Sequence, residues 1–284
     1  MAHLRIALLQ SAGHLADVAA NLAELDARAE QGRAAGAGLL VTTEMFLTGY
    51  ELAGRTAELA ARAAGEVLPA VADVARRHGL ALLVGLPELD AEGRVVNSAV
   101  LLRADGEVAG RHVKTHLFGP AERAAFTPGD VGVTLVDLDG VRIAIMICYD
   151  VEFPETVRAA AAAGAHLVAV PTAQMEPYAF VAEHVIRTRA WENQVYVAYC
   201  NHIGTEDTLT FVGRSSVVAP SGEVLAGAVD EEALLLADVD TDVVTRAHAD
   251  NPYLADRRLD LHPGPRVEVV HAPEPPAATD GAPA

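Results

Sequence analysis

Short apolar runs alternate with Ala-rich amphipathic stretches along most of this chain, and this alternation limits the folds open to it. Residues 4–9 and 39–43 have the pattern of buried strands, and residues 17–35 between them have that of a helix with one apolar face. Gly36 and Gly38 separate this helix from the strand that follows. Strands that alternate with helices are typical of an α/β architecture.

The alternation continues to about residue 239. It predicts further strands over residues 80–85, 98–102, 108–114, 141–148, 166–170, 195–200, 215–218 and 233–239. It predicts further helices over residues 68–78, from about residue 154, and over residues 178–193. Because strands that are apolar on both faces need cover on both sides, we expect sheet layers flanked by helices, an α/β sandwich.

We expect one domain over residues 1–270, because 51% of the 284 residues are hydrophobic and can form a large core. From residue 271 the sequence HAPEPPAATDGAPA has too little apolar surface to repay the entropy of ordering. Residues 271–284 are therefore predicted to be a disordered tail.

The chain carries 21 Lys and Arg against 39 Asp and Glu, which gives a net charge of −18. This charge repels phosphate backbones and anionic membranes, so we expect neither a nucleic-acid partner nor membrane association. We find no apolar run of about 18 residues and no secretory leader. The two cysteines, Cys148 and Cys200, are too few for a disulfide framework, which favours a reducing, cytoplasmic location.

Cys148 ends the apolar run VRIAIMIC and is followed by YDVEFPE, where polar residues and a proline close the strand. A nucleophile at the carboxyl end of a strand, just before a helix, projects into the crevice where α/β sheets hold ligands. An arbitrary strand cysteine is more often a small buried hydrophobe, and Cys200, in VYVAYC, is interpreted as one.

Carboxylates are better candidates than histidines for the base that a thiol needs, because no histidine pattern around Cys148 suggests a partner. Glu44 ends the strand LLVTTE, where burial could raise its pKa into the range of a general base. Lys114 ends another strand and could stabilise an oxyanion. Each could also be an ordinary exposed charge. His112 and His116 flank Lys114 but supply only two metal ligands, so we expect no metal site.

Three segments, taken together, favour catalytic roles for Cys148, Glu44 and Lys114: TTEMFLTGY, RHVKTHLFGPAERAAFTPGD and IMICYDVEFPE. They resemble the Glu, Lys and Cys motifs of the nitrilase superfamily of carbon–nitrogen hydrolases, in the same order. With PTAQMEP and RAWENQVYVAYCNHIG, the resemblance extends from residue 4 to about residue 239. It implies a four-layer α-β-β-α sandwich whose protomers pair as homodimers or higher homo-oligomers.

The resemblance also implies roles for four residues. Glu44 would be the general base, Lys114 the cation that stabilises the oxyanion, and Cys148 the nucleophile. Glu122, in AERAAFTPG, matches the family's second glutamate and would orient Lys114 and the substrate amide or water. These groups suffice to form a thioester on Cys148 and hydrolyse it, so no cofactor is expected.

The segment PTAQMEPYAFVAEHVIRTRAWENQVYVAYCN resembles bacterial aliphatic amidases, particularly those that act on ω-amino-acid amides such as 5-aminopentanamide. The expected substrate is therefore a small aliphatic carboxamide. Glu176 is a candidate partner for a substrate ammonium, or else a solvated residue at the start of a helix. Tyr50 and Tyr149 are candidate pocket walls, because each adjoins a catalytic motif.

Other functions remain open at this stage. A nitrilase, an N-carbamoyl amidohydrolase and an acyl transferase of the same superfamily would use the same Glu, Lys and Cys. A non-catalytic scaffold with the same fold is the alternative of a different class. It is disfavoured because such a protein has no physical reason to keep a buried acid, a cation and a thiol together.

Overall fold

The computed structural model describes residues 1–260 and 267–270. Its first sheet has six strands in the order β14-β1-β2-β3-β4-β5. These strands are β1 (His3–Gln10), β2 (Leu39–Val41), β3 (Ala81–Leu89), β4 (Val95–Leu102), β5 (Val108–Val113) and β14 (Ala233–Asp240). β1, β2 and β3 are parallel, so their carboxyl ends lie at one edge of the sheet.

The second sheet has seven strands in the order β13-β12-β9-β8-β7-β6-β15. They are β6 (Val133–Leu138), β7 (Val141–Ile145), β8 (Leu167–Thr172), β9 (Tyr196–Asn201), β12 (Ser216–Val218), β13 (Val224–Gly227) and β15 (Val267–Val270). β7, β8 and β9 are parallel, as in the first sheet. A two-stranded hairpin joins β10 (Thr205–Glu206) to β11 (Leu209–Thr210).

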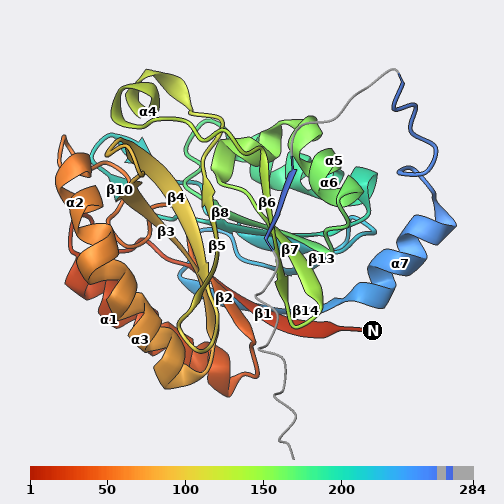
Figure 1. The fold of residues 1–284 in the computed structure, drawn as a ribbon, viewed down its shortest axis with the longest axis horizontal. Coiled ribbons are helices and arrows are strands. Elements are labelled where there is room, and N and C mark those ends of the chain that lie inside the picture. Colours follow the sequence, from red (N-terminus) through yellow and green to blue (C-terminus); the bar gives the residue numbers. More distant parts are fainter. Residues whose placement is uncertain (261–266, 271–284) are drawn as a thin grey trace, which may run out of the picture.

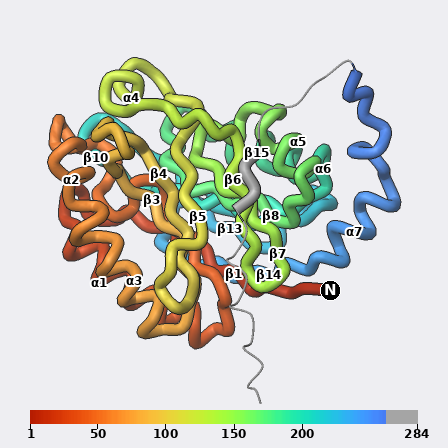
Figure 2. The backbone as a smooth tube through the Cα atoms, viewed as in Figure 1, coloured from red at the N-terminus to blue at the C-terminus, as the bar shows by residue number. Residues whose placement is uncertain are grey.

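Helices cover the outer face of each sheet, which gives four layers (Figure 1). On one side lie α1 (Val18–Ala34), α2 (Thr56–Arg62) and α3 (Leu68–His78), the last two joined by the π-turn Ala63–Val67. On the other side lie α5 (Pro154–Ala162) and α6 (Ile186–Asn193). Figure 2 shows these two groups of helices on opposite sides of the molecule. The expected α-β-β-α sandwich is confirmed.

Two further helices lie outside these layers. α4 (Gly119–Ala125) lies over one end of the sheets, at the top of Figure 1, and α7 (Thr241–Asp250) follows β14. Among the described residues, no helix has both the length and the hydropathy that a membrane span requires.

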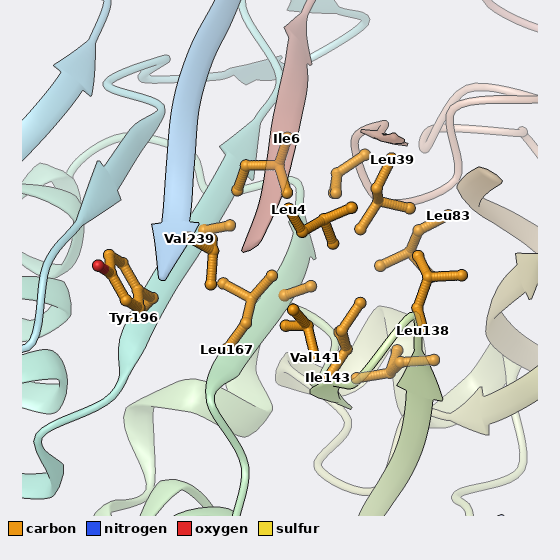
Figure 3. Packing of buried hydrophobic residues seen from close by; sticks show 14 of the residues in the cluster. Leu4, Ile6, Leu39, Leu83, Leu138, Val141, Ile143, Leu167, Tyr196 and Val239 are labelled. Carbon is orange, nitrogen blue, oxygen red and sulfur yellow. The ribbon is translucent and has the colours of Figure 1, made fainter. Parts of the chain in front are cut away.

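The inner faces of the two sheets meet in one apolar cluster (Figure 3). Leu4, Leu39 and Leu83 of the first sheet pack there against Ile143 and Leu167 of the second. Burial of each such side chain contributes about 1.5–3 kcal/mol to the stability of the folded state. Separate clusters lie between each sheet and its own helices.

Local signals in the sequence explain several boundaries. The Asp17 side chain accepts the Ala20 N–H at 3.0 Å and begins α1 as its N-cap. α3 ends at Gly79, whose φ of +58° is the left-handed conformation that glycine adopts without strain.

The structure corrects two predicted boundaries. The strand expected over residues 141–148 ends at Ile145, and Cys148 instead begins a 3-10 helix, Cys148–Glu152. The helix expected over residues 178–193 starts later, with the π-turn Val181–Val185 before α6. The chain pattern also missed β6, β10, β11, β13, β15, α2, α4 and α7. The predicted single domain over residues 1–270 stays a prediction, and the tail over residues 271–284 lies outside the described residues.

Candidate active site

Glu44 follows β2 at the end of the first sheet and is fully buried. The chain turns sharply there, because the next residue, Met45, has a φ of +55°. Gly85 on β3 permits this turn: a Cβ at that position would lie 2.6 Å from both the Thr43 oxygen and the Met45 nitrogen. The turn at Met45 and the absence of a side chain at Gly85 together determine the position of the Glu44 carboxylate.

Lys114 lies immediately after β5 and holds the centre of the site. Its Nζ donates to Glu44 Oε1 at 2.7 Å and to Glu122 Oε1 at 2.5 Å, and its side chain has no exposed surface. Its backbone N–H donates to the Asn97 carbonyl at 2.9 Å, which joins it to β4. A buried cation thus bridges two buried carboxylates.

Glu122 lies in the first turn of α4 and is held from two sides. Its Oε2 accepts the Phe118 N–H at 2.6 Å, and its Oε1 accepts the Tyr50 hydroxyl at 2.5 Å as well as Lys114. The backbone N–H of Tyr50 in turn donates to the Glu206 carboxylate at 2.8 Å. The loop after Glu44 is therefore tied both to α4 and to the β10–β11 hairpin.

Cys148 comes from the second sheet, three residues beyond the end of β7, and 5% of its surface is exposed. Its φ of +45° is strained for a residue with a side chain, which is common at functional sites. The thiol lies 3.9 Å from Gln174 Oε1, and the charges of Glu44 and Lys114 act on it. The site is therefore shared between the two sheets.

Burial and the neighbouring charges together shift the pKa values of Glu44, Lys114 and Cys148. Burial raises the pKa of Glu44, although Lys114 opposes the shift, and it raises the pKa of the Cys148 thiol well above its usual range, helped by Glu44. Burial alone would lower the pKa of Lys114, but Glu44, Cys148 and Glu122 outweigh it and raise that pKa. Lys114 is therefore a fixed cation, and the resting thiol keeps its proton.

Asp150 joins the segment after Lys114 to the turn that carries Cys148. Its carboxylate accepts bonds from His116 Nδ1 at 2.8 Å, from the Thr115 hydroxyl at 2.7 Å and from the Ile147 N–H at 3.1 Å. His112 Nε2 lies 3.2 Å from the same carboxylate. Burial opposes ionisation, but these bonds outweigh it, and the pKa of Asp150 is lowered.

His112 and His116, considered above as metal ligands, thus both face Asp150. Within residues 1–260 and 267–270, no group of three His, Cys, Asp or Glu side chains has an arrangement that could hold a metal ion.

Three residues of the site were not predicted from the sequence: Asn97, Asp150 and Gln174. Asn97 Nδ2 donates to Glu44 Oε1 at 2.7 Å, and Gln174 contacts the thiol. All three are polar residues buried within or just after apolar strands. That signal was available, because buried polar side chains need partners.

A cavity of about 520 Å³ lies beside these groups. Tyr50, Glu122 and Glu176 line it, whereas Glu44, Lys114 and Cys148 are buried and form no part of its lining. The other lining residues include five with large apolar side chains, Leu52, Phe118, Phe126, Met175 and Leu209, together with Tyr178.

Of the other predicted pocket residues, Glu176 lines this cavity and Tyr149 does not. Glu176 is exposed at this cavity. Tyr149 does not line it, but packs edge-on against Phe118, with ring centroids 5.3 Å apart. Cys200, interpreted as a core residue, is fully buried between the sheets.

Comparison with known proteins identifies the family. The model of the carbon-nitrogen hydrolase family matches residues 5–249. An (R)-stereoselective amidase from a Pseudomonas species is 38% identical over 275 residues, 94% of this chain and 98% of that protein. The solved structure of an amidase from Nesterenkonia sp. has a TM-score of 0.84 at 38% identity, over 92% of this chain and 95% of that chain.

Variants of the Nesterenkonia sp. AN1 amidase, also at TM-scores of 0.83 to 0.84, add detail about that protein. They are known in complex with acrylamide and with butyramide, and in one the acetamide moiety of fluoroacetamide is added covalently at the active-site cysteine. The present chain belongs to the carbon–nitrogen hydrolase family and is an amidase of the nitrilase superfamily.

Proposed function

We propose that this amidase hydrolyses a small aliphatic carboxamide to a carboxylic acid and ammonia through a thioester on Cys148. The observation that carries the proposal is the buried bridge in which Lys114 bonds both Glu44 and Glu122 beside the Cys148 thiol. A cation fixed between two carboxylates can hold a developing oxyanion while one carboxylate moves protons.

In the first half-reaction, sulfur attacks the amide carbon as Glu44 takes the thiol proton. The transfer accompanies attack because the pKa of the thiol is well above its usual range, and burial makes Glu44 a stronger base. Lys114 and the backbone N–H of Tyr149 stabilise the oxyanion. The C–N bond then breaks, Glu44 gives its proton to the leaving ammonia, and a thioester remains on Cys148.

In the second half-reaction, Glu44 takes a proton from water as the water oxygen attacks the thioester carbon. The tetrahedral intermediate collapses, the C–S bond breaks, and the proton held by Glu44 returns to the sulfur. Glu122, bonded by Tyr50 and the Phe118 N–H, keeps Lys114 in place and orients the substrate amide or the water. Chain groups alone carry every proton in this scheme.

We propose an ω-amino-acid amide as the substrate class. The sequence resemblance that suggested it is supported by the size of the cavity, about 520 Å³, and by its apolar wall. The related Nesterenkonia sp. AN1 amidase binds acrylamide and butyramide, which are small aliphatic amides. We further propose a cytoplasmic homodimer or higher homo-oligomer; the buried free thiols Cys148 and Cys200 fit a reducing compartment.

The test is ammonia release from aliphatic amides by the wild type and by Cys148→Ala. The variant should lose turnover with its circular dichroism unchanged. Cys200→Ala is the matched control, since it removes the other buried thiol, which among the described residues hydrogen-bonds only to the Leu9 and Val41 carbonyls. Normal turnover by Cys148→Ala would refute the proposal. Labelling of Cys148 by iodoacetamide, with Glu44 taking the thiol proton as sulfur attacks, would count against a non-catalytic scaffold.

A further inference from the structure

The side chain of Gln174 connects the nucleophile to a second, unused carboxylate. Its Oε1 lies 3.9 Å from Cys148 Sγ, and its Nε2 donates at 3.4 Å to Glu152 Oε1 and at 3.4 Å to the Tyr178 carbonyl. The two contacts of the Gln174 amide, together with the width of the amide group, place the Glu152 carboxylate within about 10 Å of the Cys148 thiol.

Both ends of this connection are held by the fold. The backbone N–H of Gln174 donates to Asn201 Oδ1 at 2.7 Å, and Asn201 Nδ2 donates back to its carbonyl at 3.3 Å. Glu152 ends the 3-10 helix that Cys148 begins, and Arg189 of α6 donates to its backbone carbonyl at 2.5 Å. Nucleophile and carboxylate therefore keep a fixed separation.

No cation among the described residues is paired with the Glu152 carboxylate. The two neighbouring cations are engaged elsewhere: Arg189 pairs with Glu192 at 2.9 Å, and Lys114 pairs with Glu44 and Glu122. Within the described part of the chain, Glu152 forms no ion pair, and its one side-chain hydrogen bond is the 3.4 Å contact with Gln174, near the upper limit for such bonds. Burial raises the pKa of Glu152, as expected for an underpartnered carboxylate.

Glu152 is better placed than Glu176 to discriminate between substrates. Glu176 is exposed, so water screens its charge, whereas Glu152 is half-buried. Glu152 is not itself part of the cavity lining, but its partner Gln174 Nε2 also bonds the carbonyl of Tyr178, which is. A carboxylate in a partly desolvated position gains more from a matching cation than a solvated one does.

We infer that Glu152, held by Gln174, is the specificity-determining residue that binds a positively charged group at the far end of the acyl chain. The inference rests on the proposed function and deepens it, because it assigns the acyl subsite of the same reaction. The ligand chemistry is an alkylammonium separated from the carboxamide by a short methylene chain, with the carboxamide at Cys148 and the ammonium at Glu152.

The test compares kcat/KM for 5-aminopentanamide with that for hexanamide, in which a methyl group replaces the ammonium. Glu152→Gln preserves the shape and the bond to Gln174 and should lower the ratio of the two values by about 10- to 100-fold, the range for a charged hydrogen bond. The loss should appear mainly in KM. Glu155→Gln, an exposed glutamate three residues on, is the matched control and should keep the wild-type ratio.

Charge reversal gives a second readout. Glu152→Lys should favour adipamate, which carries a carboxylate in place of the ammonium, over 5-aminopentanamide. An unchanged ratio in Glu152→Gln, with hexanamide still hydrolysed, would overturn the role of Glu152 and leave the amidase assignment standing. A fall in the ratio for Glu176→Gln but not for Glu152→Gln would move the subsite to Glu176. Failure of the wild type to hydrolyse any of the amides would overturn both proposals.

Discussion

Replacing Lys114 by Met tests the electrostatics of the site through stability as well as activity. The variant keeps most of the side-chain volume but removes the cation that Glu44 and Glu122 bond at 2.7 and 2.5 Å. Removing one partner of a buried ion pair typically costs about 3–5 kcal/mol, because a charge is left buried without compensation. For a chain of this size that lowers Tm by roughly 10 °C.

The cost should depend on pH. Without Lys114 the pKa of Glu44, already raised by burial, rises further, since the ammonium is the main charge that opposes the shift. The folded state then binds a proton that the unfolded state releases above about pH 4.5, so stability falls as pH rises through the folded pKa. The stability deficit of Lys114→Met relative to the wild type should therefore be larger at pH 8 than at pH 5.5.

Urea denaturation at the two pH values measures this deficit, and amide hydrolysis by the same samples should fall by at least about 10²-fold in kcat. Arg62→Met is the control, because it breaks the exposed pair between Arg62 and Glu66, which solvent screens, and should move the midpoint little. A variant as stable as the wild type at pH 8, or a deficit equal at both pH values, would refute the reasoning.

Two further substitutions test the supports of the site. Asp150→Asn should cost about 1.5–3 kcal/mol at pH 7, because the bonds from His112 and His116 lose their charged acceptor. Since folding lowers the pKa of Asp150, its stabilisation is present above the ordinary value of 3.8 and is lost as pH falls below it, so urea midpoints of wild type and variant should converge there. Tyr50→Phe removes the 2.5 Å bond to Glu122 and should lower kcat about tenfold or more; kinetics equal to the wild type would reduce Tyr50 to a pocket wall.

The sequence predicted most of the parallel core of the fold. The apolar run that follows Gly38 contains β2, Leu39–Val41, because burial on both faces leaves a nearly continuous apolar run; the strand ends before the predicted residue 43. The run over residues 141–148 misled for the same reason. It is apolar except at Arg142, but the backbone turns to a φ of +45° at Cys148, and hydropathy carries no information about φ.

The catalytic candidates were found because each lies within a recognisable motif, and the structure brings Glu44, Lys114 and Glu122 into contact. Their supports were not found, because Asn97 and Gln174 act across strands that are distant in sequence. Register and layer packing decide such contacts, and neither is visible in a local pattern.

The division of the site between the two sheets has a consequence for how the enzyme regains activity after denaturation. Glu44 and Lys114 come from the six-stranded sheet, and Cys148 comes from the seven-stranded one. The bridge of Lys114, Glu44 and Glu122 lies beside the thiol only when the two sheets are packed together. The recovery of hydrolysis during refolding therefore reports the packing of one sheet on the other, which secondary structure measured by circular dichroism does not by itself require.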